Sequence, residues 1–251
     1  MEHPNVAFII RTKNEERWIG ECLRRVFDQT YRNFEVIVID SGSHDRTLEI
    51  VSQFPVRLLQ IPPEDFSYPY ALNHAIERTR GTVTRLVMIS AHSLPISNEW
   101  LADGLSNFDD FKKVAGVYGS LRPLPGATFW DWFFQAFLGF LKTIVTPKKR
   151  RAVITDPLPG VIGFTNAIIP KELWERKKFD ESYGMGGEDQ EWATHWLSQG
   201  YCAIRDRNFM VRHSHYLGLR GWVAQRRYWQ SVGIPRPFKP LSFRKDGAHT
   251  H

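Results

Sequence analysis

Residues 34–47 read FEVIVIDSGSHDRT, and they decide the fold class of this chain. Their first six residues are apolar apart from Glu35, which is typical of a strand buried on both faces of a sheet. Asp40 ends that strand, and Gly42 with its neighbours has the chemistry of a turn. We expect a helix over 46–53, so this stretch predicts one strand–turn–helix unit of an α/β fold.

The same unit repeats on both sides of that stretch. The elements we expect are strands at 6–10, 56–59 and 86–89 and helices at 15–27, 70–80 and 97–108. Asn14 suits the N-cap of the first helix, and Gly81 suits the position after the third. Alternating strands and helices predict a mostly parallel sheet flanked by helices. Ligands bind at the carboxyl ends of such strands, so the candidate binding loops are 11–14, 40–45 and 90–93.

The second half of the chain has a less regular pattern. We expect a strand at 114–120, a helix at 188–199 and short strands at 202–204 and 209–211. No internal repeat or break in composition marks a boundary. The sequence therefore predicts a single domain over residues 1–251.

Composition narrows the class of protein. Apolar residues make up 42% of the chain and charged residues 24%, which is ordinary for a globular protein. No apolar run approaches the ~18 residues of a membrane span, and the first residues lack a signal-peptide layout. Cys22 and Cys202 form no CxxC pair, which favours a reducing, cytoplasmic location. The net charge of +6 comes without a nucleic-acid-binding motif, so we expect no nucleic-acid partner.

Three constellations carry candidate chemistry. Asp40, at the end of a buried strand, suits hydrogen bonds to a base or ribose, although an ordinary Asx turn is the alternative. The chain has neither GxGxxG nor GxxxxGK[ST]. Neither a Rossmann dinucleotide fingerprint nor a P-loop therefore supports another kind of nucleotide site. Glu188 and Asp189 open a helix, either as capping residues or as a base held ionised by the helix dipole. His213 and His215 share one face of an extended segment, as a metal or phosphate site or as structural histidines.

Together these ordered motifs resemble the inverting family 2 glycosyltransferases, which have the GT-A fold. The resemblance covers roughly residues 5–235. It rests on the strand leading to Asn14, the 35–47 stretch, Gly187-Glu188-Asp189, and an Asn73-containing helix. Segments 90–101 and 114–119, with His213-Ser214-His215 and Arg227-Tyr228, are similar to a rhamnosyltransferase-like subgroup.

The resemblance implies a role for each half of the domain. Residues 1–110 would bind the nucleotide-sugar donor, and 111–251 would form the acceptor side. Asp189 would be the catalytic base, with Glu188 positioning acceptor or donor. The donor-binding residues it implies are Arg11, Asn14, Asp40, Ser41, Ser43, Asn73, Ser90, Ala91, Arg226 and Arg227.

The chain departs from the family at its Asp-x-Asp motif, which falls on Ser90-Ala91-His92. Both carboxylates are missing there. His92, with His213 or His215, would then hold a divalent cation, Mn²⁺ or Mg²⁺, and imidazole suits Mn²⁺ or Zn²⁺ better than Mg²⁺. In a metal-free alternative, these histidines with Arg11 and Arg226 or Arg227 neutralise the diphosphate directly.

Residues 129–151 combine crowded aromatic side chains with the basic run 148–151. This pattern fits an interfacial segment on the inner face of an anionic membrane. A buried helix or a contact within a homo-oligomer are the alternatives.

The whole sequence predicts inverting transfer of a hexosyl or rhamnosyl group from a nucleotide-sugar to a glycan or lipid-linked acceptor, in cell-surface polysaccharide synthesis. The rival from another class is a catalytically inactive sugar- or nucleotide-binding protein of the same fold. Intact Glu188 and Asp189 speak against that rival, because a binding module needs no base.

Overall fold

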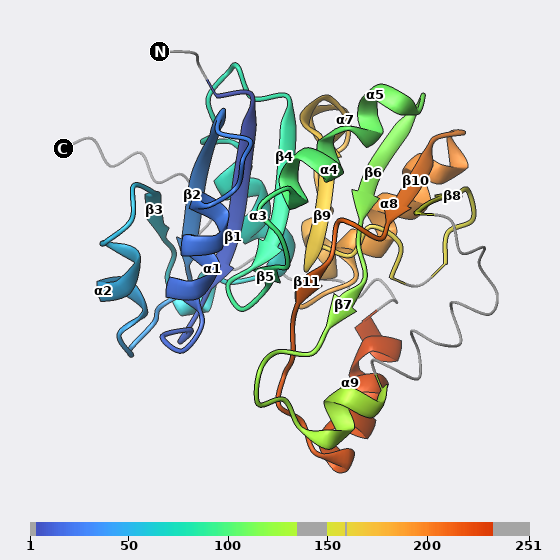
Figure 1. Ribbon diagram of the computed structural model, residues 1–251. Helices are drawn as coiled ribbons and strands as arrows, with labels where there is room; N and C mark the ends of the chain where they lie inside the picture. Colours follow the sequence, from blue (N-terminus) through green and yellow to red (C-terminus); the bar gives the residue numbers. More distant parts are fainter. Residues whose placement is uncertain (1–3, 135–149, 159, 233–251) are drawn as a thin grey trace.

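The computed structural model describes residues 4–134, 150–158 and 160–232, which form a large sheet with helices on both faces and a smaller sheet (Figure 1). The large sheet has, in spatial order, β3 (Arg57–Gln60), β2 (Phe34–Asp40), β1 (Val6–Thr12), β4 (Arg85–Ser90), β9 (Asn166–Pro170), β6 (Val114–Tyr118), β10 (Cys202–Asp206) and β8 (Arg151–Ile154). The small sheet has β5 (Leu94–Pro95), β11 (Val211–Arg212) and β7 (Leu121–Arg122).

Strand direction follows the expected pattern. β3, β2, β1 and β4 run parallel to one another, and β10 runs parallel to β6. β9 lies antiparallel between β4 and β6, and β8 pairs antiparallel with β10. The prediction of a mostly parallel sheet is therefore confirmed. The sheet crosses the division at residue 110 without a break, since β9 of the second half pairs with β4 of the first.

The helices connect these strands. They are α1 (Ile19–Phe27), α2 (Thr47–Val51), η1 (Pro63–Asp65), α3 (Tyr68–Ile76), α4 (Trp100–Leu105), α5 (Asn107–Asp110), α7 (Lys171–Arg176), η2 (Glu181–Tyr183), α8 (Glu188–Ser198) and α9 (Leu219–Val232). Residues 129–134 are also helical. Among the residues that the structure describes, no helix is both long and apolar enough to cross a bilayer.

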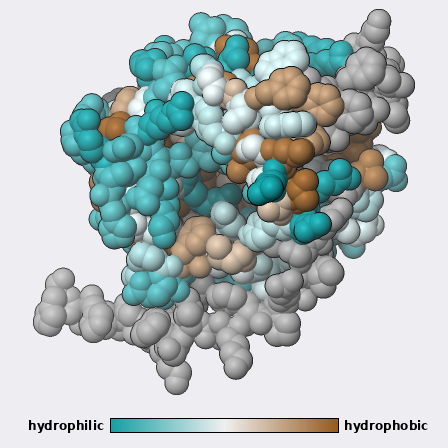
Figure 2. All heavy atoms as spheres, turned by 90° about the horizontal axis from the view of Figure 1, so that it is seen from below, coloured by the Kyte–Doolittle hydropathy of each residue, from teal (hydrophilic) through white to brown (hydrophobic). Residues whose placement is uncertain are grey.

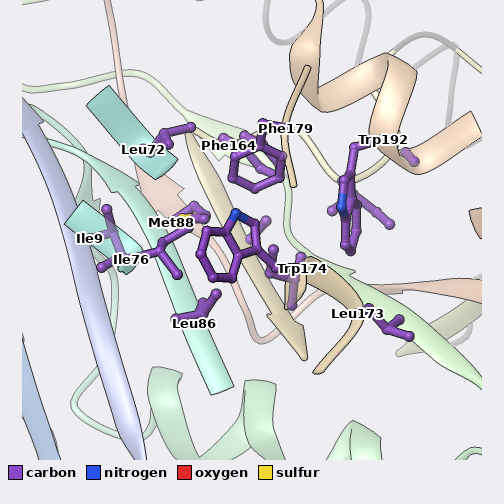
Figure 3. Packing of buried hydrophobic residues seen from close by; sticks show 14 of the residues in the cluster. Ile9, Leu72, Ile76, Leu86, Met88, Phe164, Leu173, Trp174, Phe179 and Trp192 are labelled. Carbon is purple, nitrogen blue, oxygen red and sulfur yellow. The ribbon is translucent and has the colours of Figure 1, made fainter. Parts of the chain in front are cut away.

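The core has two layers because successive residues of β1 point to opposite faces of the sheet. Phe8 packs with Leu23 and Trp100 on the face covered by α1 and α4. Ile9 packs on the other face, with α3 and α8. Figure 3 shows Trp174 at the centre of that second cluster, near Met88. Burial of such side chains contributes roughly 1.5–3 kcal/mol each to the stability of the fold.

Several helix boundaries differ from the prediction, and three of the differences have a clear physical cause. α1 begins at Ile19, because Asn14 has a left-handed φ of 54° and does not cap it. α3 ends at Ile76, where the N–H groups of Arg78 and Thr79 bond three residues back, so Gly81 plays no part. The helix expected at 97–108 is broken, since the Asn107 amide bonds the carbonyls of Asp103 and Gly104 and competes with the backbone.

Candidate active site

The candidate site lies at the carboxyl edge of the large sheet. β1, β2 and β4 are neighbours and run the same way, so the loops that follow them meet at one edge (Figure 1). These loops are the three that the sequence singles out. The fold therefore brings Arg11, Asp40 and His92 to the same edge of the molecule.

Asp40 builds the loop that follows β2. Its buried carboxylate accepts hydrogen bonds from the N–H groups of Gly42 and Ser43, both at 2.9 Å, and from the Ser43 hydroxyl. Gly42 has a φ of 84°, which a residue with a Cβ adopts only under strain. Both Asp40 oxygens thus hold a tight turn, whose backbone can approach a ligand closely.

The segment after β1 is tied to this loop. The Asn14 N–H donates to Ser43 Oγ at 2.8 Å, and the Asn14 side chain accepts from the His44 N–H at 2.8 Å. The buried Ser41 N–H donates to the Thr12 carbonyl at 3.1 Å. Asn14, Ser41 and Ser43 therefore shape the loop through hydrogen bonds to other protein groups.

Three histidines from distant parts of the chain form one cluster. His92 follows β4, and His213 and His215 follow β11. The His92 and His213 rings stack with centroids 4.4 Å apart, and the Nε2 atoms of His213 and His215 are 3.2 Å apart. One candidate ligand atom from each histidine lies within 4.8 Å of the others. The structure thus brings together the residues predicted to hold a metal.

The chemistry of the cluster fits a metal ion. The Nε2 atom of His92 is buried and lacks a hydrogen-bond partner among the described residues. Burial and the neighbouring imidazoles lower the pKa of His213 well below its usual value, and they also lower the pKa of His215. Neutral imidazole is the form that binds metals, so these residues are in the required state near neutral pH.

The acidic pair lies at the start of α8. Gly186 and Gly187, with φ values of 132° and 100°, turn the chain into the helix. Glu188 is buried, with 4% of its surface exposed, and Asp189 is half-buried. Burial and the Asp189 charge raise the pKa of Glu188 to about 7. Burial also raises the pKa of Asp189, opposite to the effect expected from the helix dipole alone.

Arg11 faces this pair from the end of β1. Its Nη1 atom is 3.6 Å from Glu188 Oε1, and its guanidinium lies 4.4 Å from the centre of the Tyr68 ring. The charge of Arg11 opposes the rise in the pKa of both carboxyls. The acidic pair is therefore held next to the positively charged Arg11, at the edge of the sheet where ligands are expected to bind.

The polar side-chain atoms of Asn73 are engaged by other described residues, and Ala91 has none. The Asn73 amide bonds to the Phe179 backbone, to Glu181 and to the Trp174 indole, at 2.9–3.2 Å. Ala91 is buried and offers only a methyl group. Ser90 is half-buried, and its carbonyl accepts from the Ser93 N–H. The Asn73 amide thus fixes the 174–181 segment, and its contact with the donor stays a prediction.

Arg226 and Arg227 are exposed on α9. The next residue, Tyr228, donates its hydroxyl to the Met185 carbonyl, and its pKa is raised by burial and by the Tyr68 and Glu188 side chains. α9 therefore reaches the acidic pair through Tyr228. Sequence reasoning did not assign Tyr228, although it follows Arg227 in a motif that the resemblance includes.

Sequence reasoning also left Glu15 without a role, although Glu15 follows Asn14 directly. The His92 Nδ1–H donates to Glu15 Oε1 at 2.7 Å. A separate pocket of about 630 Å³ lies between α1 and strands β5 and β11 of the small sheet, lined in part by Arg17, Arg25 and Arg212. None of the candidate catalytic or metal-binding residues lines that pocket.

Comparison with solved structures defines the fold. A mannosyltransferase from Pyrobaculum calidifontis, in complex with GDP-Man and Mn²⁺, matches with a TM-score of 0.66. It is 24% identical in sequence, and the match covers 90% of this chain and 61% of that chain. This likeness establishes the GT-A fold of glycosyltransferases for the present chain.

The family follows from the sequence match. The model of glycosyl transferase family 2 matches residues 7–176, which is more than half of the chain. The chain therefore belongs to glycosyl transferase family 2. This agrees with the family resemblance drawn from the motifs.

Two curated relatives extend the match. The dolichyl N-acetyl-alpha-D-glucosaminyl phosphate 3-beta-D-2,3-diacetamido-2,3-dideoxy-beta-D-glucuronosyltransferase of Methanococcus voltae is 27% identical over 244 residues, covering 88% of this chain and 70% of that protein. Glycosyltransferase AglE of Haloferax volcanii is 38% identical over 197 residues, covering 72% of this chain. The match spans 64% of the length of AglE.

Proposed function

We propose that this chain catalyses inverting transfer of a sugar from a nucleotide-sugar donor to a hydroxyl group of a glycan or lipid-linked acceptor, in cell-surface glycan synthesis. The observation that carries the proposal is the Glu188–Asp189 pair beside Arg11 at the binding edge of the sheet. Burial raises the pKa of Asp189 above its usual value, and a carboxylate with a raised pKa is a stronger base toward an acceptor hydroxyl.

In the proposed reaction, Asp189 accepts the proton of the acceptor hydroxyl as that oxygen attacks the anomeric carbon. Attack occurs on the face opposite the nucleotide, which inverts the configuration. Asp189 is anchored through its bond from the Gln190 N–H at 2.8 Å and by the buried Trp192 and Trp196 of the same helix. Such anchoring keeps the base in one orientation. Glu188, paired with Arg11, would orient the bound substrates.

The departing nucleoside diphosphate carries the developing negative charge. His92, His213 and His215 would hold a divalent cation, Mn²⁺ or Mg²⁺, which supplies positive charge to that diphosphate. The Mn²⁺ in the P. calidifontis mannosyltransferase complex supports this assignment. In the metal-free alternative, Arg11 and the exposed Arg226 and Arg227 would neutralise the diphosphate instead.

The nucleotide would bind in the half formed by residues 1–110, against the loop that Asp40 and Ser43 build. The acceptor would bind in the half formed by residues 111–251, next to Asp189. The names of the relatives support a nucleotide-sugar donor and a lipid-linked acceptor, since one was solved in complex with GDP-Man and another is named for a dolichyl phosphate-linked sugar. The rhamnosyl group suggested by the motifs belongs among the donors to be tested.

A peripheral contact with the cytoplasmic face of a membrane would bring the chain to a lipid-linked acceptor. Phe129 and Trp132 expose 70% and 63% of their surfaces, and the Trp222 indole of α9 donates to the buried Asp131 beside them. α9 adds exposed Leu219 and Val223 next to arginines. Figure 2, seen from below, shows hydrophobic and hydrophilic residues side by side on one face. Residues 135–149 of the predicted 129–151 segment lie outside the described residues.

A donor screen tests the proposal. The purified chain would be incubated with nucleotide-sugars, with and without Mn²⁺, and with a lipid-linked glycan acceptor. We expect one donor to yield a product of inverted anomeric configuration by NMR. Thermal-shift measurements with nucleoside diphosphates would identify the base, because a ligand stabilises only the folded state. Nucleotide binding without transfer to any acceptor would instead support the inactive binding protein.

A further inference from the structure

Glu15 connects the donor loop to the histidine cluster. Its backbone N–H donates to Thr47 Oγ1 at 2.7 Å, and its carboxylate accepts from His92 Nδ1–H at 2.7 Å. Thr47 is fully buried at the start of α2, so this anchor is fixed. The two bonds use different parts of Glu15, and therefore a change of its side chain leaves the backbone anchor in place.

Ser93 plays the corresponding part for His213. Its hydroxyl oxygen lies 3.0 Å from His213 Nδ1, and both side chains are buried. The Nδ1 atoms of two histidines are thus engaged by protein groups. Their Nε2 atoms are on the other side of each ring, where the Nε2 of His213 lies 3.2 Å from that of His215. A hydrogen bond at Nδ1 fixes the tautomer and orientation of a metal-binding imidazole, and it raises the basicity of Nε2.

We propose that Glu15 and Ser93 are positioning residues, which orient the imidazoles of His92 and His213 so that, together with His215, they form an all-nitrogen site selective for Zn²⁺ or Co²⁺ over Mg²⁺. This inference rests on the metal site of the proposed function and names the class of ion it takes. Mg²⁺ requires oxygen ligands, and none of the three clustered side chains is a carboxylate. Imidazole ligands follow the order in which Co²⁺ and Zn²⁺ bind more tightly than Mn²⁺.

The geometry around Glu15 argues against a purely structural role. The neighbouring Glu16 holds the segment after β1 to the loop after β2, since its carboxylate accepts from the Arg46 N–H at 3.0 Å and its N–H donates to Asp45. The Glu15 carboxylate is therefore not required for that attachment, and its recorded hydrogen bond goes to His92. Glu16 is also a matched control, because it is an adjacent carboxylate with no recorded contact to a histidine.

Metal binding by the full chain, stripped of metal beforehand, tests this inference without relying on activity. Calorimetry would measure the affinity of the chain for Zn²⁺, Mn²⁺ and Mg²⁺, and visible absorption would report the ligand field of bound Co²⁺. We expect Zn²⁺ to bind at least about 100-fold more tightly than Mg²⁺. Glu15→Gln and Ser93→Ala should each weaken Zn²⁺ binding by about 10–100-fold and alter the Co²⁺ spectrum. Glu16→Gln should leave both unchanged, and His92→Ala should abolish the Co²⁺ spectrum.

The outcomes distinguish the positioning role of Glu15 and Ser93 from the metal site itself. If His92→Ala abolishes binding but Glu15→Gln and Ser93→Ala behave like Glu16→Gln, the positioning role is wrong and the metal site stands. Equal affinity for Mg²⁺ and Zn²⁺ overturns the selectivity. If the unaltered chain binds none of these ions, the metal site of the proposed function fails as well, while the acidic pair remains testable by transfer. Circular dichroism of each variant would show that it is folded.

Discussion

The Glu188 and Asp189 side chains lie next to each other at the start of one helix, yet they have different surroundings. Asp189 accepts backbone hydrogen bonds and is half-buried, whereas Glu188 is buried against Arg11. We predict that Asp189→Asn lowers turnover by about 10²–10⁴-fold, the usual effect of losing a general base. Donor affinity by calorimetry should change little, because the base acts on the acceptor.

The matched control for that substitution is Glu191→Gln on the same helix, where the carboxylate pairs with Lys177 at 3.0 Å. It should keep near-normal turnover. If Asp189→Asn also keeps it on a confirmed acceptor, Asp189 is not the base and Glu188 becomes the next candidate.

The raised pKa of Glu188 also predicts how stability depends on pH. Its pKa rises from 4.5 to about 7 on folding, so the folded protein disfavours the ionised form. Below pH 4.5 Glu188 is protonated in both states and carries no penalty. Between pH 4.5 and 7 the unfolded chain releases this proton first, and the free energy of unfolding falls, by roughly 3 kcal/mol in the limit. Above pH 7 the loss is complete.

Urea denaturation of the unaltered chain and of Glu188→Gln, at pH values from 4.5 to 8, measures this effect. Glu188→Gln should lack the Glu188 contribution, so its stability advantage over the unaltered chain should grow with pH. Parallel pH profiles for the two proteins would show that Glu188 is not desolvated as described.

At the scale of secondary-structure elements, Asn73 joins α3 to the segment that leads toward α8. Its amide serves the Trp174 indole and both backbone groups of Phe179. We predict that Asn73→Ala lowers the free energy of unfolding by about 1–3 kcal/mol or more, because buried partners lose their hydrogen bonds. Denaturant titration measures this loss. Weaker nucleotide binding with unchanged stability would instead support the predicted donor contact of Asn73.

Elements were predictable from sequence to different degrees. The parallel strands of the first half were accurate, because apolar runs such as 34–39 record burial on both faces. β9, at 166–170, and β8, at 151–154, were not predicted, although β9 lies between β4 and β6 in the large sheet. Helix ends were less accurate because tertiary contacts set them. Asn14 has the chemistry of an N-cap, yet its amide oxygen accepts from the His44 N–H, in a loop 30 residues away.

The candidate site shows the same limit. The motif order located the histidines and the acidic pair, since residue type and position at strand ends carry that signal. The sequence could not show that the Asn73 amide is satisfied by residues about 100 positions further on. Nor could it pair Glu15 with His92, because that contact depends on how β1 and β4 align in the sheet.

At the scale of the whole molecule, we predict binding to anionic vesicles through the face that holds Phe129 and Trp132. The double substitution Phe129→Glu and Trp132→Glu should reduce cosedimentation with phosphatidylserine vesicles to the level seen with neutral vesicles, because aromatic burial and basic charge act together. Val153→Glu is a control, since Val153 is 52% exposed on β8. Equal loss with the control, or no vesicle binding at all, would count against a membrane contact.

The place of β9 in the sheet has a consequence for how the chain folds on the ribosome. β4 finds one neighbour, β1, early in the sequence, but its other neighbour is made of residues 166–170. Until those residues leave the exit tunnel, one edge of β4 presents unpaired backbone groups. Exposed strand edges favour pairing with other chains. Synthesis stalled after β4 has left the tunnel but before β9 has should therefore leave a nascent chain that depends on chaperones, and release should follow soon after β9 inserts between β4 and β6.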